Sequence, residues 1–116
     1  MTQSIMNLLS QALTLSQQAE SVVTNNLANY ETPGFHPQQL KFQTALAQAW
    51  NRGQNVSAVH GQMVTQSGAV RPDGSGVSMT AQMSELMKVQ LLYATAAQGY
   101  TREYTEVKAA VQGQAL

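Results

Sequence analysis

Cysteine is absent from this 116-residue chain, and charged residues are scarce. The lack of cysteine excludes disulfides, thiolate metal sites and cysteine nucleophiles. Charged residues form only 10% of the chain, whereas a typical soluble domain has about 25%, and the six basic and six acidic residues cancel. No basic patch suits nucleic acid, and no charge run suits an anionic membrane surface. We therefore expect neither of these partners.

Long apolar runs are also missing. None approaches the roughly 20 residues of a membrane-spanning helix, so we do not expect an integral membrane protein. No positive charge precedes Lys41, and the basic region of a cleavable secretory signal is therefore not expected. Glutamine and alanine are abundant instead, and a face made of uncharged amides costs less to cover with protein than a charged one. The length suits one small domain over residues 1–116.

The residues that catalysis or metal binding requires do not gather in the sequence. His36 and His60 lie 24 positions apart, and no metal-binding HExxH pattern occurs. Glu103 and Glu106 stand beside basic residues, which favours an ion-paired solvated helix face over an acid/base pair. We predict no enzyme, no catalytic residue, no metal, no cofactor and no small-molecule substrate. A helical hydrolase fragment is the disfavoured enzymatic alternative.

The first segment carries an apolar stripe with helical period. Its members are spaced alternately by three and four residues, as in the seam of a coiled-coil helix. They are Ile5, Leu8, Ala12, Leu15, Ala19, Val22, Asn26 and Asn29. This spacing predicts a helix over residues 3–29 that buries the seam.

The last segment repeats this pattern over a greater length. Its seam consists of Met79, Met83, Leu86, Gln90, Tyr93, Ala97, Tyr100, Tyr104, Val107 and Val111. No proline interrupts it, so we predict a helix over residues 79–112, roughly 50 Å long at 1.5 Å per residue. The three tyrosines either pack into a core or anchor a neighbouring subunit, since tyrosine is amphipathic and common in interfaces.

The middle of the chain has no sustained period. A short apolar patch, Leu40 to Trp50, indicates a turn or two of helix within residues 30–50. Five of the eight glycines fall in residues 51–78, where we predict a flexible loop with possible strands at 56–59 and 62–65. Within "RPDGSG", Pro72 presets φ and Gly74 is free to take a positive φ, which predicts a turn. The predicted fold class is all-α: two long terminal helices packed as a coiled-coil-like pair, joined by a glycine-rich, partly disordered segment.

Two helices alone enclose little apolar volume. Many seam positions are alanine, asparagine, glutamine or tyrosine, so burial offsets only part of the entropy lost on ordering the chain. We therefore expect other chains to supply the missing walls of both seams.

The stretch "NNLANYETPGF" ends the first predicted helix. Thr32 precedes proline and is pushed out of helical space, while Pro33 and Gly34 suit the centre of a type II turn. The asparagines on the seam can bond freed carbonyls at the helix end or amides across an interface, and we favour the interface. On that interpretation Asn26→Leu leaves a soluble monomer that assembles poorly.

This stretch closely resembles the signature near the N-terminus of bacterial flagellar axial proteins, the rod and hook families. "LKFQTALAQ" (40–48), "VRPDGSGVSM" (70–79) and "QLLYATAAQGYTREYTEVKAAV" (90–111) also resemble rod-protein segments. The assembly motif that this resemblance implies is Asn25, Asn26, Leu27, Ala28, Asn29, Thr32, Pro33, Gly34 and Phe35. The short length suits the small rod proteins, because the hook and distal rod carry large inserted domains.

The resemblance implies a structural subunit that assembles into a hollow helical tube. Its implied partners are other rod subunits, the membrane-ring and export-gate base, and the flagellar type III export apparatus, for which Ile5–Leu9 is a candidate recognition element. Its implied location is the basal body, in the periplasmic space after export. Two alternatives stay open: a sister small rod subunit, and a secreted helical-hairpin protein with Trp-x-Gly at its bend, although here Trp50 and Gly53 are one residue too far apart.

Overall fold

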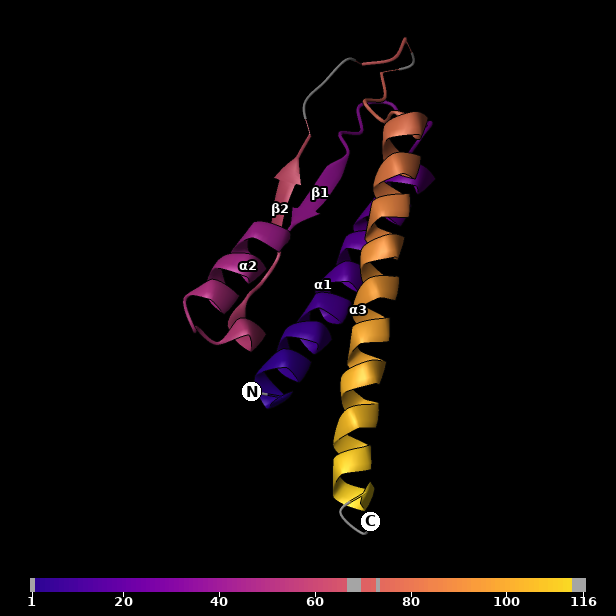
Figure 1. Ribbon diagram of the computed structural model, residues 1–116. Helices are drawn as coiled ribbons and strands as arrows, with labels where there is room; N and C mark the ends of the chain where they lie inside the picture. The colour runs from indigo at the N-terminus through magenta and orange to yellow at the C-terminus, as the bar shows by residue number, and fades with distance from the viewer. Residues whose placement is uncertain (1, 67–69, 73, 114–116) are drawn as a thin grey trace.

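The computed structural model describes residues 2–66, 70–72 and 74–113, so part of the predicted loop, residues 67–69 and 73, lies outside the described residues. The molecule is elongated, with extents of 68 × 26 × 14 Å. Its elements, in chain order, are α1 (Thr2–Ala28), β1 (Gln38–Lys41), α2 (Gln43–Asn51), the 3₁₀ turn η1 (Val56–Ala58), β2 (Gln62–Thr65) and α3 (Met79–Gly113). Figure 1 shows α1 and α3 as the two long rods, with the small elements on one side of α1.

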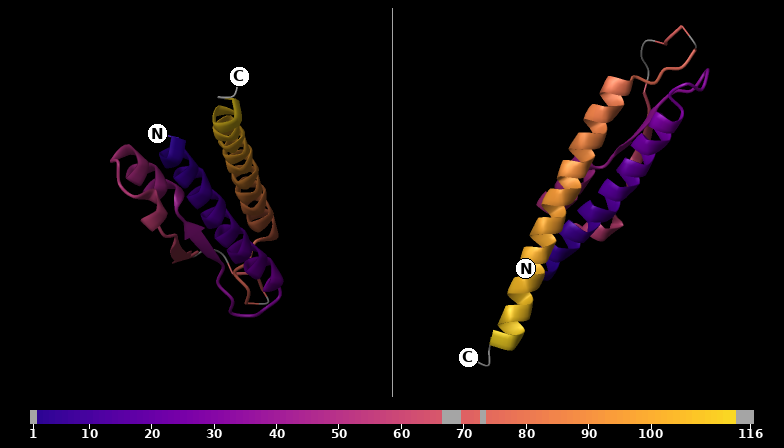
Figure 2. Two further views of the ribbon diagram at one scale, coloured as in Figure 1. Left: turned by 90° about the horizontal axis from the view of Figure 1, so that it is seen from below. Right: turned by 90° about the vertical axis from the view of Figure 1, so that its right-hand side faces the viewer.

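The two long helices pack against each other along α1, as predicted. Two contacts fix their antiparallel register: the Asn26 side chain bonds Gln82, and Leu9 lies beside Gly99, where an added Cβ would come within 3.2 Å of the Leu9 side chain. Gly99 therefore allows a close approach of the two helices. With this register α3 continues past the described start of α1, as Figures 1 and 2 show.

The middle of the chain is more ordered than the sequence indicates. β1 and β2 form a two-stranded antiparallel sheet with Gln38 opposite Thr65 and Lys41 opposite Gln62. The strand predicted at 62–65 is confirmed, but the one predicted at 56–59 is wrong, because this segment forms η1 with Asn55 capping the Ser57 amide. β1 was not predicted, so the chain is mostly helical with a small sheet and not all-α.

The core lies on the α1 face shared by the other elements. Its two apolar clusters are Ala12, Leu46, Ala49, Val56 and Ala96, and Leu15, Ala19, Phe42 and Val89. The first cluster joins α2 and η1 to the two long helices, while the second seals the start of α2 against them. The predicted N-terminal seam is confirmed at Ala12, Leu15, Ala19 and Asn26, but Val23 is buried where Val22 was expected.

The buried stripe of α3 differs from the predicted seam. Gln82, Val89 and Ala96 are its buried residues, and they precede predicted seam members by one position. One residue rotates the face by about 100°, so the predicted seam lies at the edge of the buried face. The apolar pattern misled the prediction because α3 carries apolar side chains on more than one face.

Candidate assembly surfaces

Asn26 is the centre of the signature segment, residues 25–35, and it is fully buried. Its Nδ2 donates to the Gln38 carbonyl at 2.7 Å and to Gln82 Oε1 at 2.9 Å. Its Oδ1 accepts from the Gln38 amide at 3.0 Å. One side chain thus joins α1, β1 and α3. The expected bond across a subunit interface is wrong for Asn26, because its donors and acceptor are used within the chain.

The neighbouring asparagine Asn29 ends α1. Its Nδ2 donates to the Asn25 carbonyl at 2.8 Å, which satisfies one of the carbonyls left free at a helix C-terminus. The Thr32 hydroxyl in turn donates to Asn29 Oδ1 at 3.1 Å. Helix termination is therefore the role that the structure gives to Asn29, while Asn25 is exposed.

The turn predicted at Pro33 and Gly34 is present. The Phe35 amide donates to the Thr32 carbonyl, and Gly34 has φ 78°, the positive value that a type II turn needs at its third residue. The Gly34 amide donates to the Gly74 carbonyl at 2.8 Å. Gly74 itself has φ 89°, as its predicted turn requires, so the two turns support each other.

Arg71 makes a contact that sequence reasoning missed. Its guanidinium lies 3.6 Å from the centroid of the Tyr30 ring and donates to the Tyr30 and Val77 carbonyls. It therefore fastens the approach to α3 onto the end of α1. Neither residue belongs to a periodic pattern, and their separation of 41 positions hides the pairing from the sequence.

The signature segment thus makes most of its contacts within the chain. We call the hydrogen bonds of Asn26 to Gln38 and Gln82 the latch, because they hold α1, β1 and α3 together. Leu27 and Phe35 are half-buried, and part of the motif remains on the surface. These exposed members are Asn25, Ala28, Thr32, Pro33 and Gly34. They are the motif residues that an assembly contact at this end of the molecule can still use.

The remaining residues of the predicted seams differ in how far they are buried. Leu15 is buried, and a half-buried set follows the sides of the hairpin: Ile5, Leu8, Val22, Leu86, Tyr93 and Tyr100. Met83, Tyr104 and Val107 are exposed. By the register that the Asn26–Gln82 and Leu9–Gly99 contacts fix, Tyr104 lies beside the first turn of α1, and Val107 stands where α3 begins to extend past it.

A second apolar surface of α3 faces away from α1. Met83, Met87 and Leu91 are spaced by four residues, and the side chains of Met87 and Leu91 are 67% and 69% exposed. By helical geometry this outer stripe is roughly opposite the buried Gln82–Val89–Ala96 stripe. A helix that is apolar on two opposite faces is typical of an element enclosed on both sides in an assembly.

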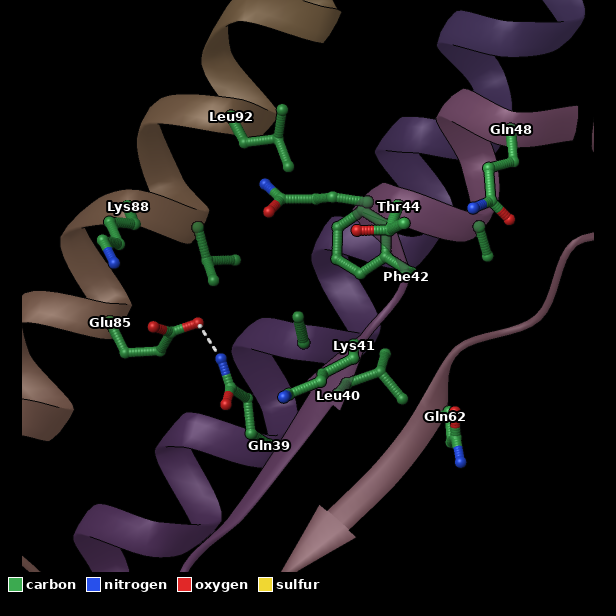
Figure 3. A pocket seen from close by; sticks show the side chains of 14 residues that line it. Gln39, Leu40, Lys41, Phe42, Thr44, Gln48, Gln62, Glu85, Lys88 and Leu92 are labelled. Atoms are coloured by element: carbon green, nitrogen blue, oxygen red, sulfur yellow. Dashed lines mark hydrogen bonds between the residues drawn. The ribbon is translucent and has the colours of Figure 1, made fainter. Parts of the chain in front are cut away.

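A groove of about 540 Å³ opens between α3 and the β1–α2 segment. Figure 3 shows Glu85, Lys88 and Leu92 on α3 facing the side chains of β1 and the start of α2. Ala19, Phe42 and Val89 contribute apolar walls, and Gln39 donates to Glu85 at the rim at 3.3 Å.

The described residues offer no cluster of three or more histidine, cysteine or carboxylate side chains that could hold a metal. Nor does any helix in the described ranges combine the length and apolarity needed to cross a membrane.

An elongated helical hairpin with polar contacts at one end and exposed apolar surfaces on its long arm is typical of a protein that associates with others. Residues 6–36 match the family model described as Flagella basal body rod protein, which confirms the resemblance predicted from the sequence. No curated protein matches the chain. The match covers most of α1 and the whole signature segment.

This family is one of structural proteins, and the match indicates a structural subunit of the flagellar basal body rod. It implies a location in the basal body and assembly with other basal-body components.

Proposed function

We propose that this chain is a subunit of the proximal rod, which connects the membrane-ring and export-gate base to the distal rod and transmits torque. The observation that carries the proposal is the family match over residues 6–36. The rod-like segments at 40–48, 70–79 and 90–111 favour the proximal member among the small rod proteins. A sister small rod subunit is the second candidate, since the family match does not separate the two.

The α1–α3 hairpin suits the transmission of torque. A long helix supported by a second helix resists bending, and Asn26 opposes sliding of α3 along α1, because a shift of register would break its buried hydrogen bond to Gln82. Load applied to the outer stripe of α3 would pass through the latch to α1 and the sheet. We treat residues 1–116 as one rod-type domain for this reason.

The remaining exposed motif residues and the outer stripe are the surfaces that we assign to contacts with other rod subunits. We further assign Ile5–Leu9, half-buried along α1, to recognition by the type III export apparatus, which would deliver the chain to the periplasmic space. Deletion of Ile5–Leu9 should abolish secretion, and undiminished secretion would reject this assignment.

The proposed function is tested by replacing the chromosomal copy with Met87→Ser/Leu91→Ser. Both side chains are exposed, so the variant should fold and be secreted normally while rods fail to form and swarming is lost. The matched control is Met63→Ser, at an exposed methionine on the sheet, which should swarm normally. Normal rods in the α3 variant would contradict the role of the outer stripe. Absence of the tagged chain from purified basal bodies would contradict the proposed function itself.

A further inference from the structure

The far end of α3 carries a third apolar surface. Tyr104, Val107 and Val111 are 54%, 37% and 74% exposed, and their spacing of three and four residues places them on one side of the helix. This end stripe continues the face that α1 covers nearer the latch, because Val107 follows Val89 and Ala96 at multiples of the helical repeat. The exposed fractions of these three side chains show that the described part of α1 does not bury this stripe as it buries Val89 and Ala96.

The groove between α3 and the β1–α2 segment is suited to receive an apolar helix face. Its walls include Phe42, Val89 and Leu92, and its rim is polar. Its volume of about 540 Å³ is within the range of roughly 300–1,000 Å³ typical of binding clefts. It can accept a few side chains from a helix that lies across it, as in helix-in-groove recognition, where anchors recur at i, i+3 or i+4, and i+7.

The charges of the two surfaces also correspond. The rim carries Lys41 and Lys88, and Glu85. On α3, Glu103 borders the end stripe on one side and Lys108 borders it on the other, by helical geometry. A helix lying in the groove can therefore place Glu103 near a rim lysine and Lys108 near Glu85.

One chain cannot make this contact with itself. The groove wall and the end stripe belong to the same continuous helix, Met79–Gly113, and Leu92 and Val107 are about 22 Å apart along its axis. If the end stripe fills such a groove, the groove must therefore belong to another molecule. A second copy of this chain provides such a groove.

We propose that the end stripe of one subunit, Tyr104, Val107 and Val111, docks in the α3–β1–α2 groove of a second copy. Such a head-to-tail contact uses different surfaces on the two partners, so it propagates into a ring or an open helical array. This proposal rests on the proposed function in one respect: the contact would be one of the interfaces between subunits that a rod needs.

Cross-linking of purified chains tests the pairing. The sequence contains no cysteine, so single cysteines introduced at Ala45, on the groove, and at Val111 report on one pair of surfaces. A mixture of Ala45→Cys and Val111→Cys chains should give a mixed disulfide dimer under mild oxidation. The matched control mixes Ala45→Cys with Val70→Cys, at a valine that is also exposed, 54% against 74% for Val111, but lies outside both surfaces, and should give little mixed dimer.

Adding Val107→Asp to the Val111→Cys chain should lower the mixed dimer about tenfold, because an apolar anchor is replaced by a charged group that must lose its water on entering the groove. Circular dichroism of this variant should match the parent, since Val107 belongs to neither buried cluster of the core. Lys41→Glu/Lys88→Glu in the groove chain should also lower the yield, and Glu103→Lys in the other chain should restore part of it.

Equal yields from the groove and control mixtures, or a yield unaffected by Val107→Asp, would overturn the proposal. Recruitment of the chain into basal bodies is measured separately, so a failed cross-link with normal recruitment would reject this contact and leave the proposed function standing.

Discussion

The two ends of the α1–α3 hairpin differ in how their side chains are satisfied. The latch end lies around Asn26 and Gln82, and the free end is the part of α3 around Val107 and Val111. At the latch end, Asn26, Asn29 and Arg71 direct their polar groups to carbonyls and amides of the same chain. At the free end, Val107 and Val111 leave apolar side chains in contact with solvent. Unpaired polar groups and exposed apolar groups both carry a free-energy cost. Contacts within one molecule remove the cost of the polar groups at the latch end, but not that of the apolar groups at the free end.

This difference separates folding from assembly. The latch end holds most of the signature segment and determines the register of α1 against α3. The outer and end stripes of α3 contribute little to the fold of one chain, so changes there should alter association and spare the free energy of unfolding. The predictions below compare the two kinds of surface.

The largest effect is expected in the buried core around Leu15. Leu15→Ala should lower the free energy of unfolding by roughly 2–5 kcal/mol, because Leu15 is almost fully buried and the change leaves a cavity. Leu91→Ala, on the outer stripe, should lower it by less than about 0.5 kcal/mol. Urea denaturation of the two purified variants measures both values. Equal losses would show that the outer stripe is part of the fold.

Asn26→Leu should lower the free energy of unfolding by about 3 kcal/mol, because it leaves the amide and carbonyl of Gln38 and the Gln82 side chain without their partner. This prediction replaces the expectation of a stable but assembly-defective monomer. Asn25→Leu, at an exposed neighbour, is the matched control and should change the value by less than about 0.5 kcal/mol. Thermal unfolding at low protein concentration distinguishes the two outcomes.

Arg71→Lys should cost about 1–2 kcal/mol. Lysine keeps the charge but loses the planar group that stacks on Tyr30 while bonding two carbonyls. Arg52→Lys, at an exposed position on the end of α2, serves as the control and should be neutral. A neutral Arg71→Lys would indicate that the approach to α3 is held without the guanidinium.

Gly34→Ala should cost about 1 kcal/mol, because alanine disfavours the positive φ of this turn. Open space surrounds the added Cβ, so the effect comes from the backbone alone. Gly113→Ala, at the end of α3, has equal space without a positive φ and should be neutral or slightly stabilising. A difference in melting temperature between the variants reports the strain.

Much of the helical framework could be predicted from the sequence. The apolar residues of α1 are spaced alternately three and four positions apart, which places Ala12, Leu15 and Ala19 on the buried face. Pro33–Gly34 predicts the turn that follows. These features depend on residues only a few positions apart, so the spacing of residues along the sequence is enough to predict them. β1 was missed because "QQLK" is short and mostly polar, and it is a strand only through its pairing with β2.

The sequence by itself determined the two long helices, the turns at Gly34 and Gly74, and the signature that matches the rod-protein family model, because each depends on local backbone preference or on a contiguous motif. Only the tertiary structure decided which face of α3 is buried and which partner Asn26 bonds. The buried face of α3 depends on its contacts with α1, such as Leu9 with Gly99. The partners of Asn26 are Gln38 and Gln82, 12 and 56 positions away. Because α3 has several apolar faces and an amide can bond many groups, only the packing of these distant segments selects among them.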